Sequence, residues 1–216
     1  MHPRFPPFVC LPAGRRRRAL ALAAACLLGV GAGFAEPERS GRLSPDVESL
    51  AKGVFVRLPP PPSWKETDAA GVWTADEIRA AFARVTDTPP QINHVRAEFL
   101  RPRADWLREF KGWFGKLERP LRLRFEGEQW DCDNYANCFV TFADLLVLRS
   151  GEARGTLGVG WATVYYRRPF AGIEGGAHAV VIAAAGEGLF VIEPQDGTMV
   201  PLEKFPNRDS IEAVYF

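Results

Sequence analysis

The sequence predicts an α+β fold, with a helical first half and an antiparallel sheet in the second half. Apolar residues recur at helical intervals between residues 74 and 150, and short apolar runs separated by Gly, Asp or Asn follow Gly151. Removing an N-terminal export signal leaves about 181 residues, which is enough for one substantial core.

Two helices are expected before residue 120. Thr74 and Glu77 have the spacing of a capping box, and apolar residues then recur until prolines at 89 and 90 end the helix. A second amphipathic helix carries a stripe of large apolar residues, namely Trp106, Phe110, Trp113 and Leu117. Such a stripe is typical of a helix surface that faces the core.

A third helix is expected over residues 132–150 and carries Cys132 at its start. Asp131 can cap its N-terminus, and Gly151 is a natural stop. The strands are expected at 156–166, 177–184, 189–192, 199–202 and 211–215. We therefore expect the third helix to pack on a C-terminal antiparallel sheet.

The first 35 residues have the pattern of an export signal peptide. Arginines at 15–18 precede small and apolar residues at 19–35. A retained membrane anchor is the alternative, but only about 17 apolar residues are available where roughly 20 are needed to span a bilayer. We expect cleavage, no stable membrane span afterwards, and a secreted or periplasmic protein.

Residues 36–70 are expected to form a Pro-rich leader or linker. Four consecutive prolines at 59–62 favour an extended polyproline segment. The segment is either a surface strap pinned by Trp64 and Trp73 or a loose tether. Residues 71–216 would then form the folded domain.

The charge of the chain argues against a nucleic-acid partner. The whole chain has 27 basic and 26 acidic side chains, but the first 35 residues contain five arginines and no acid, so the remainder has 22 basic against 26 acidic groups and a net charge of −4. A mildly acidic protein without a basic stripe has no electrostatic basis for binding nucleic acid.

Cys132, His178 and Glu193 form a candidate catalytic triad of nucleophile, base and orienting carboxylate. A helix N-terminus favours the thiolate and offers N–H groups to an oxyanion. His178 opens an apolar strand, and Glu193 follows fifteen residues later, as a strand, a turn and a returning strand would require. His94 lies in a polar stretch without a partner pattern, so His178 is the favoured base.

Other polar residues are candidates for supporting roles. Gln129, three residues before the cysteine, could donate a side-chain N–H to an oxyanion. Gln195 and Asp196 compete with Glu193 for the orienting role, and Asn134 is a more remote rival. These alternatives stay open at the level of sequence.

Two features oppose a reactive Cys132. Asp131 and Asp133 flank it and disfavour a negative sulfur, so a nearby histidinium would be needed to offset them. A disulfide to Cys138 is the other alternative in an oxidising compartment. On a helix, six residues rise about 9 Å and turn about 240°, whereas bridging requires Cα atoms within roughly 7 Å. The bridge stays open only if the helix begins later than expected.

The same segments carry a family resemblance. Residues 130–136, His178-Ala179 and residues 193–197 are similar to the papain-like cysteine-protease domain that follows the sugar-binding module in certain mushroom agglutinins. More loosely, they resemble bacterial transglutaminase-like cysteine peptidases. The resemblance covers roughly residues 125–202 and implies a papain-like fold with Cys132, His178 and Glu193 as its catalytic residues.

The chain also departs from these families. It has no sugar-binding trefoil, Glu126 stands where papain-like enzymes place a glutamine, and Val180 replaces an aromatic residue common in transglutaminase-like chains. No loop of spaced Asp and Asn ligands of EF-hand type is present. The agglutinin's sugar binding, calcium activation and dimerisation are therefore not transferred.

Three functions are compatible with these patterns. The first is an exported cysteine hydrolase, a peptidase or amidase that acts through an acyl-enzyme on a peptide or protein substrate. The second is a transglutaminase-like acyl transferase or a cell-wall peptide hydrolase. The third is a non-catalytic binding or envelope module on the same fold. None of the three calls for a cofactor or a metal.

Overall fold

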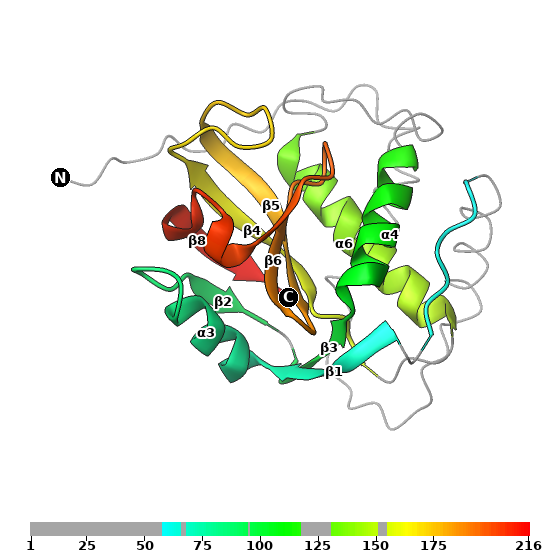
Figure 1. The fold of residues 1–216 in the computed structure, drawn as a ribbon. Coiled ribbons are helices and arrows are strands. Elements are labelled where there is room, and N and C mark those ends of the chain that lie inside the picture. The colour runs from blue at the N-terminus through cyan, green and yellow to red at the C-terminus, as the bar shows by residue number, and fades with distance from the viewer. Residues whose placement is uncertain (1–57, 66–67, 95, 118–130, 151–154) are drawn as a thin grey trace, which may run out of the picture. The chain divides into compact units, whose positions relative to one another are not determined.

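The structure is a computed structural model that describes residues 58–65, 68–94, 96–117, 131–150 and 155–216 (Figure 1). The expected signal, most of the expected leader and Gln129 lie outside these ranges. Within them, no helix is long and apolar enough to cross a membrane.

Among the described residues, the strands form two sheets. A small antiparallel sheet pairs β1 (Ala69–Thr74) with β3 (Glu98–Pro102). A six-stranded sheet has the order β2-β8-β4-β5-β6-β7. Its strands are β2 (Gln91–Asn93), β4 (Val159–Tyr166), β5 (Gly176–Ala185), β6 (Gly188–Ile192), β7 (Met199–Pro201) and β8 (Ile211–Tyr215). All neighbours are antiparallel except β2, which runs parallel to β8.

Three α-helices accompany the sheets in the described part of the chain, so the predicted α+β class is confirmed. They are α3 (Ala75–Ala83), α4 (Ala104–Phe114), which a 3-10 turn extends to Leu117, and α6 (Cys132–Ser150). The capping box at α3 is present, because Thr74 Oγ1 accepts from Glu77 N at 3.1 Å and Glu77 accepts from Thr74 N at 2.7 Å.

The expected separation of helices and strands is wrong in one respect. Three strands, β1, β2 and β3, lie in the half of the chain that was expected to be helical. They are short, and β2 is a polar edge strand of three residues that lacks the apolar alternation on which strand prediction depends. Pairing with β8, the last strand of the chain, holds β2 in the sheet.

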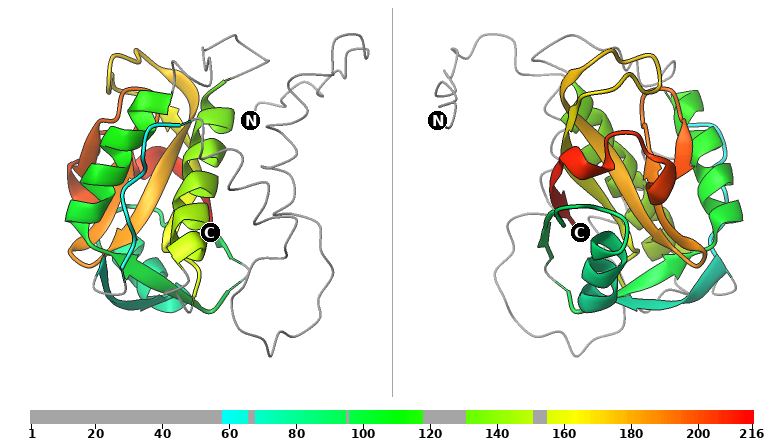
Figure 2. Two further views of the ribbon diagram at one scale, coloured as in Figure 1. Left: turned by 90° about the vertical axis from the view of Figure 1, so that its right-hand side faces the viewer. Right: turned by 60° about the vertical axis from the view of Figure 1, so that its left-hand side comes forward.

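Strand β5 separates two apolar clusters. Ala179, Val181 and Ala183 belong to a cluster that includes the buried faces of α4 and α6, whereas Val180 and Ile182 belong to a cluster with α3. This alternation follows from the two-residue period of a strand. Figure 2 shows α6 and α4 alongside the strands. The helix that begins at Cys132 therefore packs on the sheet, as predicted.

Residues 58–65 are held against α4. The Trp64 ring is buried and meets the Trp106 ring edge-on, with centroids 4.8 Å apart. Trp106 Nε1 donates to Ser63 O at 3.2 Å, and Trp113 Nε1 donates to Pro59 O at 2.9 Å. This part of the expected leader is thus a strap along the helix.

Candidate active site

Cys132 is the first residue of α6 and is partly exposed. Asp131 caps the helix as expected: its backbone oxygen accepts from Tyr135 N at 3.2 Å, and its carboxylate accepts from Asn134 Nδ2 at 2.9 Å and from Asn134 N at 3.5 Å. The sulfur therefore lies beside the positive end of the helix dipole, where a thiolate is stabilised.

His178 and Glu193 meet across the β5–β6 hairpin. The pairing of Val181 with Ile192 brings the two side chains together, and His178 Nε2 lies 2.7 Å from Glu193 Oε2. Glu193 is fully buried. Its other oxygen accepts from Gln195 N at 3.1 Å. The carboxylate is thus held from two sides in the geometry that orients an imidazole.

The His178 ring also contacts the nucleophile candidate. The Cys132 side chain is close enough to act on the imidazole, and because Nε2 contacts Glu193, Nδ1 is the ring nitrogen left for the sulfur. Burial alone would lower the pKa of His178, but hydrogen bonds to Cys132 and Glu193 and their negative charges raise this pKa to about 9. The structure therefore brings the three predicted side chains into one cluster.

Tyr166 is a member of this cluster that sequence reasoning missed. Its hydroxyl donates to Glu193 Oε2 at 3.4 Å, and its ring centroid lies 4.9 Å from that of His178. Burial, together with the negative charge of Glu193, raises the pKa of Tyr166 far above its usual range, so it stays a neutral donor. Only the pairing of β4 with β5, which places Tyr166 opposite Gly176, could have identified it.

Asp131 and Asp133 interact with each other on either side of Cys132. A hydrogen bond to Asp131, supported by burial and by the charge of Asp131, raises the pKa of Asp133 to about 6. The same bond lowers the pKa of Asp131. One negative charge near the sulfur is therefore removed as the pH falls below about 6.

The rivals for the orienting role are directed elsewhere. Gln195 contributes its backbone N–H to Glu193. The Asp196 carboxylate accepts from Thr198 N at 2.6 Å and from Thr198 Oγ1 at 2.8 Å, within its own turn. Glu193 is therefore the carboxylate that contacts the histidine.

His94 takes part in a different set of contacts. Its Nδ1 donates to Arg96 O at 2.7 Å, and its Nε2 accepts from Arg79 Nη2 at 2.9 Å. Gln129, the predicted oxyanion donor, lies outside the described residues. His178, the predicted base, therefore has an observed position in the cluster, whereas the role of Gln129 as an oxyanion donor stays a prediction.

Cys132 and Cys138 are both thiols, with no disulfide between them. Cys138 is buried about one and two-thirds turns further along α6, as the helical spacing predicts. Among the residues that the structure describes, no three or more His, Cys, Asp or Glu side chains form a group that could hold a metal ion.

The fold and this site define an α+β protein with a Cys-His-Glu cluster at the start of a buried helix. No known protein family and no curated protein matches the sequence. Among solved structures, the chain is similar to the mushroom agglutinin PSL1a, a lectin, in complex with E64. The sequence identity is 15% and the TM-score is 0.49. The match covers 67% of this chain and 51% of that chain.

A second similar structure is Polyporus squamosus lectin bound to a human-type influenza-binding epitope, with 16% identity, a TM-score of 0.47, and coverage of 67% of this chain and 49% of that chain. This chain spans about half the length of both structures. The papain-like and transglutaminase-like assignments remain predictions.

Proposed function

We propose that this protein is an exported, papain-like cysteine hydrolase that cleaves peptide or isopeptide amides through an acyl-enzyme. One observation carries the proposal: His178 lies between the Cys132 side chain, which acts on its pKa, and the fully buried Glu193, whose Oε2 is 2.7 Å from His178 Nε2. Such a cluster is the arrangement that activates a thiol and then protonates a leaving amine.

In the proposed reaction, Cys132 attacks the scissile carbonyl as a thiolate while His178 holds the proton as an imidazolium. The raised pKa of His178 supports this charge distribution at neutral pH. Backbone N–H groups at the start of α6 are available to the tetrahedral oxyanion. When the C–N bond breaks, His178 gives its proton to the amine.

Deacylation reverses the roles of these groups. His178, now neutral, takes a proton from water as the water attacks the thioester, and then returns the proton to the sulfur as the acid product leaves. Glu193 keeps Nε2 protonated throughout by accepting its hydrogen bond. No step in this sequence requires a cofactor.

The test is hydrolysis of a mixed peptide library by the wild-type chain and by Cys132→Ala. We expect hydrolysis in the wild type and its complete loss in the variant, with iodoacetamide labelling Cys132 faster than a free model thiol. The matched control is Cys138→Ala, because Cys138 lies on the same helix but is buried. Hydrolysis that survives Cys132→Ala contradicts the proposal.

Acyl transfer to an amine is the related alternative, because the same thioester can react with an amine instead of water. A glutamine peptide and a labelled primary amine are supplied together. Incorporation of the label would assign a transglutaminase-like transferase, whereas release of ammonia without incorporation supports hydrolysis. Cell-wall peptides are the second substrate class to be tested, by release of soluble fragments.

The second alternative is that the protein is a binding module and not an enzyme. The two carboxylates beside Cys132 oppose a thiolate, which favours this reading. A binding module predicts that Cys132 alkylates no faster than a model thiol while a ligand is still retained. The proposed export is tested separately, by finding the processed chain outside the cytoplasm.

A further inference from the structure

A cavity of about 420 Å³ lies next to the residues that follow β4, and Cys132, His178 and Glu193 are not among its lining residues. Its other wall comes from η4 (Leu202–Lys204), η5 (Arg208–Ser210) and the residues between them. The volume is in the range of pockets that hold small organic ligands. Nothing in the proposed hydrolysis uses this cavity.

The lining of the cavity is strongly cationic. Four lining residues, Arg167, Arg168, Lys204 and Arg208, are positive and only Asp209 is negative, which gives a net charge of +3. The whole chain is nearly balanced, with a formal charge of +1. The positive charge is therefore a local concentration, and such a concentration attracts anions.

One wall of the cavity is fixed by a buried asparagine. Asn207 Oδ1 accepts from the backbone N–H groups of Arg167 and Arg168, both at 2.9 Å, and Asn207 Nδ2 donates to Arg168 O at 2.8 Å. Asn207 is 2% exposed. These three bonds fix the backbone of Arg167 and Arg168 against the opposite wall, while both arginine side chains stay exposed.

The single anionic residue of the lining neutralises little of this charge. Asp209 Oδ1 accepts from Asp87 N at 2.9 Å, and its other oxygen is 3.7 Å from Arg208 Nε. Arg208 Nη1 donates to Glu203 O at 2.7 Å. Arg208 is thus held in place, while the other three cations have no acidic partner among the lining residues.

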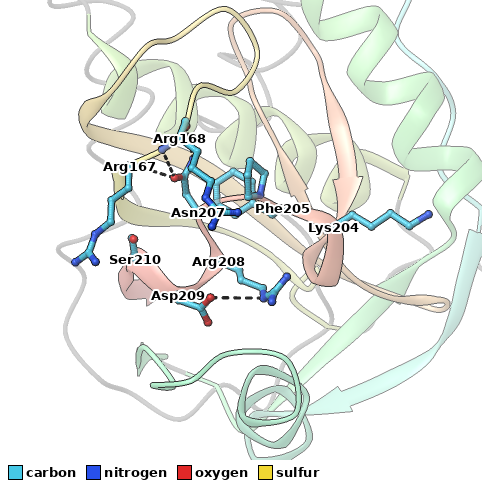
Figure 3. A pocket seen from close by; sticks show the side chains of 9 residues that line it. Arg167, Arg168, Lys204, Phe205, Asn207, Arg208, Asp209 and Ser210 are labelled. Carbon is cyan, nitrogen blue, oxygen red and sulfur yellow. Dashed lines mark hydrogen bonds and ion pairs between the residues drawn. The ribbon is translucent and has the colours of Figure 1, made fainter.

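Arg167 and Lys204 lie on opposite walls of the cavity. Figure 3 shows Arg167 and Lys204 extending in opposite directions from the two sides of the cavity. Both side chains are exposed. Long exposed side chains can fold over a bound anion without disturbing the buried Asn207.

We propose that this cavity binds a small organic anion that carries a phosphate or a carboxylate group, through Arg167, Arg168, Lys204 and Arg208. Guanidinium groups suit both anions because their paired N–H donors match the two oxygens of either group. Pro206, which is partly exposed, supplies an apolar surface for the organic part. This site goes beyond the proposed hydrolase and does not depend on it.

The test is isothermal titration of the full chain with inorganic phosphate, phosphoserine and citrate. We expect saturable binding of at least one probe by the wild type. Arg167→Gln combined with Arg168→Gln should weaken that binding at least tenfold, since two charge-assisted contacts are lost. Tighter binding of phosphoserine than of citrate would assign the phosphate, and the reverse order would assign the carboxylate.

Matched controls separate the cavity from general charge effects. Arg103→Gln combined with Arg108→Gln removes the same charge from exposed positions at α4 and should change binding less than twofold. Both variants retain the arginines at 15–18, which also attract anions. Cys132→Ala should bind like the wild type, so failure of the hydrolase leaves this result intact. No saturable binding, or equal losses in both arginine variants, overturns the proposal.

Lys204→Gln provides a second measurement in case the double variant fails to fold. Lys204 is the last residue of η4, and its side chain is exposed. Its replacement should therefore leave the fold intact. We expect a two- to fivefold weaker affinity. Wild-type affinity in this variant, together with an unfolded double variant, would contradict the assignment.

Discussion

Tyr166 lies against His178, with ring centroids 4.9 Å apart, and its hydroxyl donates to the Glu193 oxygen that contacts the histidine. The tyrosine is 1% exposed. Its ring therefore keeps water away from the bond between imidazole and carboxylate, and a hydrogen bond in such surroundings is electrostatically stronger than one in water. The aromatic ring is therefore part of the site.

Replacing Tyr166 should separate the role of its ring from that of its hydroxyl. We expect Tyr166→Ala to lower the free energy of unfolding by about 3 kcal/mol, because it leaves a cavity in the core. Tyr166→Phe should cost about 1 kcal/mol or less, since the hydroxyl bond is long. Urea denaturation measures both.

The neighbouring Tyr165 is the matched control for this prediction. It is 52% exposed, so Tyr165→Ala should change the free energy of unfolding by no more than about 0.5 kcal/mol. Equal losses in the free energy of unfolding for the two alanine variants would contradict a stabilising role for the buried Tyr166 ring.

Sequence patterns were sufficient where a single local rule determines the structure. The capping box at Thr74 and the cap at Asp131 depend only on residues within one helical turn, and both are observed. The hairpin that carries His178 and Glu193 follows from two apolar runs and a short turn. Its pairing also explains why a separation of fifteen residues brings these two side chains together.

The rest depends on contacts between distant segments. Strand β2 forms because it meets β8, which lies about 120 residues later, and no local signal announces this pairing. Tyr166 reaches Glu193 only through the register of β4 against β5. The basic cavity likewise arises because Asn207 ties Arg167 and Arg168 to a turn forty residues away.

Glu193→Gln should lower the pKa of His178 from about 9 toward its ordinary value of 6.5. The carboxylate raises this pKa through both a hydrogen bond and its negative charge, and an amide supplies no charge. Titration of the histidine ring by NMR measures the change. Glu203→Gln, at an exposed position, is the matched control and should leave the titration unchanged.

The same pKa predicts a pH dependence of stability. The folded protein holds the His178 proton more tightly than the unfolded chain, so this group stabilises the fold fully below about pH 6.5 and the contribution is lost as the pH rises through about 9. Urea midpoints between pH 6 and 10 should therefore fall in the wild type, and they should fall less in Glu193→Gln. Parallel curves for the two proteins would contradict the link between Glu193 and His178.

Asp133→Asn should make Cys132 more reactive above pH 6. The asparagine can still donate a hydrogen bond to Asp131, but the negative charge beside the thiolate is gone. We expect alkylation at pH 7.5 to accelerate about three- to tenfold, with little change at pH 5, where Asp133 is already protonated. Peptide mapping distinguishes Cys132 from Cys138. Asp105→Asn, an exposed change on α4, should have no effect, and an equal acceleration there would contradict the local charge effect.

Asp144, a partly buried carboxyl in α6, should make the fold less stable as the pH rises. Burial raises its pKa from 3.8 to about 7, although a hydrogen bond from the Leu157 backbone opposes this. The folded state therefore binds the proton more tightly, and stability falls between about pH 4 and pH 7. Asp144→Asn keeps an acceptor for the Leu157 N–H and removes the charge. Its free energy of unfolding at pH 8 should therefore exceed that of the wild type by about 1 to 2 kcal/mol, with no difference at pH 4. Asp76→Asn, at a position that is 90% exposed, should leave the pH dependence unchanged. If the free energy of unfolding of Asp144→Asn fell with pH as steeply as that of the wild type, ionisation of Asp144 would not be the cause of the fall.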